Sequence, residues 1–178
     1  MVDDSYDFLF IGDHTHAVDS KNRVMLPLSF RRNFPSGTED RIVLLRGTSG
    51  CIEAHVRPEW RQHIMQFRNL GRYNKEDRTL RRLVLSGATE LELDGQSRVL
   101  MPKKLTDMAG IGSEARFIGL GPFFEIWNPQ RYDDFVVQHG SLYDELMERL
   151  DGRRAVQQKA AEHGAQDQHD VPSAGNGA

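Results

Sequence analysis

Apolar and polar residues alternate along several short segments of the chain, and turn-forming residues separate these segments. This period of two is typical of half-buried β-strands, in which successive side chains point to opposite faces. Thr15–Val18 and Glu90–Leu93 are clear examples. Together with the returning strands and second strand pairs that follow these two segments, strands are predicted over residues 15–18, 24–26, 42–45, 52–55, 90–93, 99–101, 117–120 and 124–127.

Other segments carry apolar residues at the spacing of an amphipathic helix. One stripe runs from Trp60 to Leu70, and a second follows Asn74, a residue type that caps helix N-termini. A third begins after Asn128-Pro129, which is a start signal for a helix, and continues to Leu150. We expect Gly140 to interrupt it. The sequence therefore predicts helices between and after the strands.

The chain contains one sequence unit twice. The first copy, His16-Ala-Val-Asp-Ser-Lys-Asn-Arg-Val-Met-Leu-Pro27, aligns with Leu91-Glu-Leu-Asp-Gly-Gln-Ser-Arg-Val-Leu-Met-Pro102. Both segments have the pattern Asp-x-x-x-Arg-x-x-x-Pro. Further along, Cys51-Ile-Glu-Ala-His55 aligns in the same order with Phe123-Phe-Glu-Ile-Trp127, at a slightly shorter offset. The difference falls in a loop, where insertions are tolerated.

These copies are too small to fold alone, because a strand unit of about 40 residues cannot bury a hydrophobic core by itself. We expect an α+β protein in which two pseudo-symmetric hairpin units, each with a returning strand after its turn, pack on each other or interleave. The expected organisation is a first unit over 13–60, a helical connector over 61–88, a second unit over 89–132, a C-terminal helix over 133–151 and a disordered tail over 152–178.

The distribution of charge changes the impression given by the net charge of −3. Residues 14–104 hold 17 Lys and Arg against 10 Asp and Glu, whereas both flanking segments are acidic. Local positive charge, and not the average over the chain, governs contact with phosphate. The chain has no apolar run of membrane-spanning length, no secretory signal pattern and a single cysteine. We therefore expect a cytoplasmic protein with no membrane partner.

Each copy places donor-rich side chains on a short turn between two predicted strands. Arg can clamp a phosphate or a guanine edge through two N–H groups, and Asn and Gln can bind adenine. We expect these turn residues to contact double-stranded DNA: Lys21, Asn22, Arg23, Gln96, Ser97 and Arg98.

The acidic residue and the proline of each copy suit a structural role. Asp19 and Asp94 can accept backbone N–H groups and orient the Arg four residues later. Pro27 and Pro102 cannot donate to a strand ladder, so each should end its strand. The alternative is that Asp and Arg form only a structural ion pair. The two interpretations are compatible if Arg pairs with Asp in the free protein and with phosphate when DNA is bound.

Several motifs carry a resemblance to a known family. They are Phe10-Ile-Gly12, Asp19-Ser-Lys-Asn-Arg23 with Leu26-Pro27, Pro58-Glu-Trp60, Glu92-Leu-Asp-Gly-Gln-Ser-Arg98 with Met101-Pro102, and Phe124-Glu-Ile-Trp127. With these motifs in this order over about residues 9–150, the sequence resembles the MraZ family of bacterial regulators. That family is built from two AbrB/SpoVT-type swapped-hairpin units, so the resemblance implies two AbrB-like units in one β-barrel body.

The resemblance also implies a function. It indicates a repressor of its own division and cell-wall gene cluster that binds short direct repeats in the promoter and associates with the nucleoid. It further implies ring-shaped homo-oligomers that present many motif arginines to one DNA. The family pattern has Gly before each motif Arg, where Asn22 and Ser97 stand here. Asn tolerates the positive φ that Gly allows, and Ser tolerates it less well.

Other candidate sites carry weaker signals. His14-x-His16 lacks the companion ligands of a metal site, so we expect strand-surface histidines and no metal. Cys51 is expected to be a small core residue. The sequence has no catalytic or cofactor motif, so we expect neither an enzyme nor a cofactor. The basic run over 68–82 is either a second DNA surface or a solvated helix face or subunit contact. An antitoxin-like protein-binding assembly module remains the alternative function.

Overall fold

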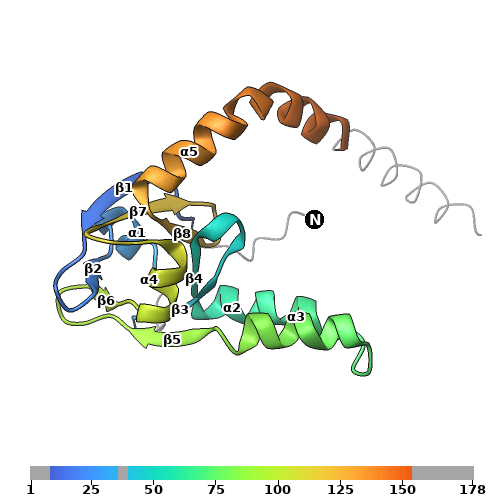
Figure 1. The fold of residues 1–178 in the computed structure, drawn as a ribbon, viewed down its shortest axis with the longest axis horizontal. Helices are drawn as coiled ribbons and strands as arrows, with labels where there is room; N and C mark the ends of the chain where they lie inside the picture. The colour runs from blue at the N-terminus through green and yellow to red at the C-terminus, as the bar shows by residue number, and fades with distance from the viewer. Residues whose placement is uncertain (1–8, 36–39, 154–178) are drawn as a thin grey trace, which may run out of the picture. The chain divides into compact units, whose positions relative to one another are not determined.

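The computed structural model describes residues 9–35 and 40–153. The chain divides into two compact units, residues 1–133 and 134–178. All of the described strands lie in the first unit (Figure 1). Within the described ranges, no helix is both long enough and apolar enough to cross a membrane.

The elements follow one another in an order that repeats the two copies. They are β1 Asp13–Ala17, β2 Arg23–Met25, α1 Leu28–Arg32, β3 Arg41–Arg46, η1 Thr48–Gly50, β4 Ile52–Val56, α2 Arg57–Gln66, η2 Phe67–Asn69, α3 Lys75–Leu85, β5 Thr89–Glu92, β6 Arg98–Leu100, α4 Lys103–Ala109, β7 Glu114–Gly119, β8 Phe124–Trp127, α5 Pro129–His139 and η3 Gly140–Leu142. Each strand overlaps one of the segments predicted to be a strand. The mixed α+β class is confirmed.

The strands form a six-stranded sheet, in the order β1-β7-β8-β4-β3-β5, and a separate two-stranded ribbon of β2 and β6. Every pairing among the described strands is antiparallel, and β3 pairs with β4 and β7 with β8 as expected. The order ends at β1 and β5, so these pairings among the described residues do not close the sheet into a barrel.

The pairing of the first strands of each copy differs from the expectation. β1 was expected to pair with its returning strand β2, but β1 pairs with β7 of the second copy. Likewise β5 pairs with β3, and β2 pairs with β6. A single bridge between Val18 and Val24 joins β1 to β2. These pairings show that the two copies interleave. The sequence did not predict the partners, because alternation indicates which face of a strand is buried but does not select the strand it pairs with.

The core lies where the two copies meet. Val24 of β2 and Val99 of β6 are both fully buried, and they face each other across the ribbon. Phe10, Phe30 and Phe124 form a cluster whose ring centroids are 5.1–5.5 Å apart. The absence of a side chain at Gly119 lets the backbone of Phe10 approach, because a Cβ there would lie 2.4 Å from the Phe10 carbonyl oxygen.

The sequence pattern did not predict the short helices α1 and α4. They contain 5 and 7 residues, which is too short to display a helical period. Each begins directly after the proline of its copy and buries apolar residues, Phe30 in α1 and Leu105 in α4. A proline that ends a strand can equally precede a helix, because its fixed φ suits a helix start.

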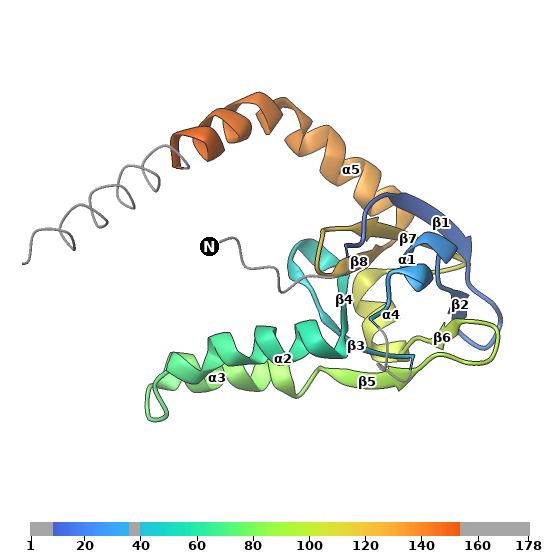
Figure 2. The same ribbon diagram turned by 180° about the vertical axis from the view of Figure 1, so that it is seen from behind.

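Helices α2 and α3 lie side by side and away from the ribbon (Figure 2). The side chain of Asn74 accepts hydrogen bonds from the backbone N–H groups of Glu76 and Asp77, at 2.8 and 3.1 Å, so the predicted cap is confirmed. Arg81 of α3 donates to the carbonyl oxygens of Phe67 and Leu70 at 2.8 and 2.7 Å. These bonds connect α3 to the η2 segment that follows α2.

The second unit begins within α5, whose start after Asn128 matches the prediction. The α-helix ends at His139 and Gly140 opens a 3-10 turn, as expected for an interrupting glycine. Helix then resumes over residues 143–153. Residues 152 and 153, which were assigned to the tail, are helical; the rest of the expected tail lies outside the described residues.

Candidate nucleic-acid interface

The turn before β2 is held by the carboxylate of Asp19. Its Oδ1 accepts hydrogen bonds from the backbone N–H groups of Lys21 and Arg23, both at 2.9 Å. The main chain closes the same turn, because Asp19 N–H donates to the Arg23 carbonyl and Asn22 N–H to the Asp19 carbonyl, again at 2.9 Å. The short Asp side chain thus replaces water at two backbone donors.

The turn before β6 repeats this arrangement atom for atom. Asp94 Oδ1 accepts from the backbone N–H groups of Gln96 at 2.9 Å and Arg98 at 3.0 Å. Asp94 N–H donates to the Arg98 carbonyl at 2.9 Å, and Ser97 N–H donates to the Asp94 carbonyl at 2.8 Å. The two turns therefore differ in their exposed side chains but not in their backbone.

Each turn aspartate also binds the arginine four residues later. Asp19 Oδ2 accepts from Arg23 Nε at 2.8 Å and Nη2 at 2.7 Å, and Asp94 Oδ2 binds Arg98 with the same two distances. These bonds, followed by the backbone N–H bonds, lower the pKa of Asp19 and of Asp94 to about 2. Both carboxylates are therefore ionised at neutral pH.

The arginines retain donors for a second acceptor. Their side chains are 29% and 25% exposed for Arg23 and Arg98. Both ion pairs use Nε and Nη2 of the guanidinium and leave Nη1 outside the contact with Asp. A phosphate or a guanine edge can therefore meet each guanidinium while Asp still orients it.

The register of the β2–β6 ribbon places both arginines on one of its faces. Arg23 is directly opposite Leu100, Met25 is opposite Arg98, and these four alternate with the buried pair Val24 and Val99. Diagonal neighbours across such a ribbon lie roughly 7–8 Å apart at Cα. The ribbon therefore brings together, on a single surface, the two arginines that the sequence places in separate copies.

The residues before the arginines adopt left-handed backbone conformations. Asn22 has φ 63° and Ser97 has φ 58°. In this conformation the Asn22 carbonyl accepts the N–H of Met101, and the Ser97 carbonyl accepts the N–H of Leu26, both at 3.0 Å. Each turn is therefore hydrogen-bonded to the residue that follows the ribbon strand of the other copy, Met101 after β6 and Leu26 after β2.

The side chain of Asn22 has a structural role that the sequence did not reveal. Its Nδ2 donates to the Met101 carbonyl at 2.6 Å and to Thr106 Oγ1 at 3.3 Å. The amide donor of Asn22 is therefore used inside the protein, and the contact of Asn22 with DNA stays a prediction. Lys21 and Gln96, by contrast, are exposed.

The family profile described as "MraZ protein, putative antitoxin-like" matches residues 9–83 and 84–154. Each matched segment contains one of the two turns. The chain belongs to the MraZ family.

Relatives of this MraZ chain carry the name transcriptional regulator MraZ. The relative from Pelotomaculum thermopropionicum is 34% identical over 142 residues, which cover 80% of this chain and 95% of the relative. A relative from Ureaplasma parvum serovar 3 is 35% identical over 142 residues, covering 80% and 97%. That of Roseiflexus castenholzii is 34% identical over 128 residues, covering 72% and 87%. The resemblance carried by the sequence motifs is confirmed.

The basic run of this MraZ chain lies on the α2–α3 side of the first unit. Arg68, Arg72, Arg78 and Arg82 are exposed, whereas Arg81 donates to carbonyl oxygens of the segment that follows α2. Figures 1 and 2 both show this side away from the β2–β6 ribbon. The run and the ribbon are therefore separate surfaces.

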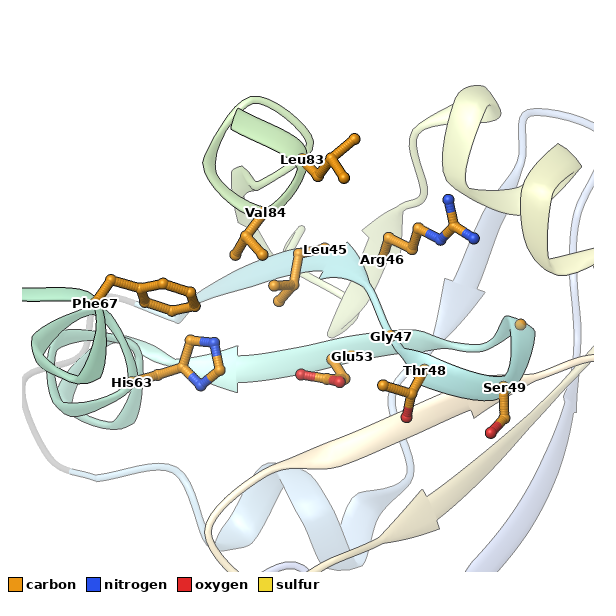
Figure 3. Close-up of a pocket in the computed structure, with 11 residues that line it drawn as sticks. Leu45, Arg46, Gly47, Thr48, Ser49, Glu53, His63, Phe67, Leu83 and Val84 are labelled. Carbon is orange, nitrogen blue, oxygen red and sulfur yellow. The ribbon is translucent and has the colours of Figure 1, made fainter. Parts of the chain in front are cut away.

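A hollow of about 490 Å³ lies between α2, α3 and the segment after β3 (Figure 3). Phe67 and Val84 line it together with His63, whose pKa is lowered mainly by burial. None of its lining residues belongs to the MraZ turns, so this hollow is not part of the candidate interface.

The other candidate residues pack within the fold. His14 Nε2 lies 3.0 Å from Ser29 Oγ, and His16 contacts the Phe117 ring with centroids 5.8 Å apart. Among the residues that the structure describes, no group of three or more His, Cys, Asp and Glu is arranged to hold a metal ion. Cys51 is fully buried, and its thiol donates to the Thr48 carbonyl at 3.1 Å.

Proposed function

We propose that this chain is a sequence-specific DNA-binding transcriptional regulator whose DNA-contacting surface is the β2–β6 ribbon with its two turns. The observation that carries the proposal is the placement of Arg23 and Arg98 on one ribbon face, each oriented by its own aspartate. Two-stranded β-ribbons fit the major groove of B-DNA. The transcriptional regulators named among the relatives support the same function.

Binding is proposed to use the guanidinium donors that the turn aspartate leaves available. In the free protein, Nε and Nη2 of Arg23 bind Asp19, which holds the side chain in one orientation. The remaining N–H donors then bind a phosphate or a guanine edge without first losing side-chain entropy. Lys21 contributes a phosphate contact beside the first arginine, and Gln96 a neutral hydrogen-bonding group beside the second. The first copy thus contributes more to the electrostatic affinity.

The remaining roles follow the family resemblance and are part of the same proposal. The regulator represses its own division and cell-wall gene cluster by binding short direct repeats in the promoter, and it associates with the nucleoid in the cytoplasm. It assembles into ring-shaped homo-oligomers. Several ribbons in one ring can meet successive repeats, so weak contacts add through effective concentration.

A footprint of the full chain on the DNA upstream of its own gene tests this function. Protection of short, regularly spaced repeats is expected. The logarithm of the binding constant should fall linearly with the logarithm of the salt concentration, with a slope of about −0.9 for each phosphate neutralised. Protection that is absent at low salt, where phosphate contacts are strongest, would overturn the proposal.

The second candidate function is an antitoxin-like module that binds a protein partner instead of an operator. The description of the matched family, which contains the term antitoxin-like, favours it, and so does the acidic charge of residues 105–178. The same footprint separates the two functions. A purified chain that protects no promoter DNA but forms a defined complex with a co-expressed partner protein would support the module.

A further inference from the structure

Two large aliphatic side chains are exposed on the ribbon face that carries the arginines. Met25 is 48% exposed and Leu100 is 54% exposed. They occupy the same position of the repeated unit, two residues after the motif arginine and two before the proline. Both copies therefore present the same chemistry, an arginine and an aliphatic residue, on the outer face of a three-residue strand.

Core packing does not account for these side chains. The ribbon uses its other face for the core, where Val24 and Val99 are fully buried. Two exposed aliphatic side chains on one face, bordered by charged groups, form the kind of apolar patch that is typical of a contact surface. Met is also flexible and polarizable, which suits contact with an irregular apolar partner.

The register brings each aliphatic residue next to an arginine of the other copy. Leu100 is directly opposite Arg23, and Met25 is directly opposite Arg98. Opposed residues of an antiparallel pair have Cβ atoms about 4.5–5.5 Å apart. Neighbouring base pairs of B-DNA are separated by about 3.4 Å along the axis. A group bound by the arginine and a group touched by the aliphatic side chain are thus on the same or adjacent base pairs.

We propose that Met25 and Leu100 contact the C5-methyl groups of thymine in the major groove, and so help to determine the sequence that the ribbon binds. The inference rests on the proposed function. Thymine methyls are the apolar groups that the major groove presents, next to the guanine acceptors that arginine binds. The charges of Arg23 and Arg98 select DNA as the occupant of this face, because an apolar protein partner would have to bury both ion pairs beside the aliphatic residues.

Uracil substitution tests the contact without changing the protein. The DNA upstream of the chain's own gene is amplified once with dTTP and once with dUTP, which removes every thymine methyl. Wild-type protein, Met25→Ala, Leu100→Ala and the double variant are measured on both DNAs at one salt concentration. Leu28→Ala is the matched control, since Leu28 is 63% exposed but lies on α1 outside the ribbon.

Burial of one methyl group is worth about 0.8 kcal/mol, which corresponds to about a fourfold change in affinity. We expect wild-type protein to bind the uracil DNA at least about fourfold more weakly than thymine DNA. The double variant should bind thymine DNA with a similar loss and should show no further loss on uracil DNA. Leu28→Ala should behave as wild type. Melting curves and size-exclusion chromatography should be unchanged in all variants.

Two outcomes would overturn the inference. One is equal affinity of the wild-type protein for thymine and uracil DNA, which would leave the proposed function intact. The other is a change in assembly state in Met25→Ala or Leu100→Ala, which would assign these side chains to a protein contact. Failure of the wild-type protein to bind either DNA would instead count against the proposed function itself.

Discussion

Asn22 and Met101 are joined by two hydrogen bonds between the copies. The N–H of Met101 donates to the Asn22 carbonyl at 3.0 Å, and Asn22 Nδ2 donates to the Met101 carbonyl at 2.6 Å. The second copy has the first kind of bond, between Leu26 and Ser97, but among the described residues the Ser97 side chain makes no bond equivalent to that of Asn22. The two turns have the same backbone conformation, but the first is stabilised by one more hydrogen bond between the copies.

This inequality predicts opposite effects of glycine at the two equivalent positions. Serine at φ 58° has a strained left-handed backbone, and Ser97→Gly relieves this strain of roughly 1–2 kcal/mol. Glycine also gives the unfolded chain more backbone freedom, which lowers the stability by a smaller amount of about 0.5–1 kcal/mol. The variant should be slightly more stable. Asn22→Gly also gives up the bond to the Met101 carbonyl and should be about 1 kcal/mol less stable.

Urea denaturation monitored by circular dichroism measures both changes. The two variants serve as controls for each other, because they alter the same backbone position of the repeat. Destabilisation by Ser97→Gly that equals that of Asn22→Gly would contradict the assignment of a structural hydrogen bond to the Asn22 side chain alone.

The turn carboxylates predict a pH dependence with a definite sign. The pKa of Asp94 is lowered from 3.8 to about 2, first by the hydrogen bond from Arg98 and then by backbone N–H bonds. A group with a lowered pKa stabilises the fold above its unfolded pKa and loses that contribution as the pH falls. The contribution should be complete above about pH 5 and disappear between pH 4 and pH 2.

Carbon NMR titration of the Asp94 carboxyl group checks this directly, with a midpoint expected near pH 2. In Arg98→Gln the midpoint should rise toward the ordinary value of 3.8 but not reach it, because the backbone N–H bonds remain. A wild-type midpoint near pH 4 would show that the ion pair does not persist in solution.

The elements that the sequence predicts well are those with a repeating pattern. Alternation located β1 and β5, the order of short segments within each copy located the other strands, and the cap at Asn74 and the start at Asn128 located two helices. The strand partners could not be derived from the sequence, because the alternation around Val24 is the same whether β2 pairs with β1 or with β6. The interleaving of the copies is therefore a tertiary property.

The candidate site was predicted in its residue types but not in its geometry. Asp19 and Arg23 are close in sequence, so their contact follows from the turn. The placement of Arg23 and Arg98 on one face depends on the β2–β6 pairing, which no local pattern encodes. The donor role of Asn22 depends on Met101, which is distant in the chain. The exposure of Met25 and Leu100 likewise appears only once the ribbon face is known.

The buried thiol predicts an unreactive cysteine. Burial is the main cause that raises the pKa of Cys51, with the carboxylates of Glu125 and Glu53 adding to it. The thiolate is the reactive form, so native protein should react with a disulfide reagent at least tenfold more slowly than unfolded protein. Since this is the single cysteine of the chain, absorbance of the released thiol reports it alone. Equal rates with and without urea would contradict the burial.

The unequal side chains of the turns predict different salt dependences. Lys21→Gln gives the first turn the neutral side chain of the second, and Gln96→Lys does the reverse. The first change should reduce the magnitude of the salt slope of promoter binding by about 0.9, and the second should increase it by a similar amount. Fluorescence anisotropy at a series of salt concentrations measures both slopes. Unchanged slopes in both variants would place the turns away from phosphate.

The most direct test of the DNA-reading ribbon is the affinity of the Arg23→Ala, Arg98→Ala double variant for its promoter DNA at one fixed salt concentration. Arg149→Ala is the matched control, because Arg149 also pairs with a carboxylate four residues away, at 2.6 Å from Glu145, but lies outside the ribbon. A specific arginine contact is worth about 1–3 kcal/mol, so loss of both should weaken binding by at least tenfold. Arg149→Ala should bind as wild type. A folded double variant that binds as tightly as the wild-type protein would contradict the account.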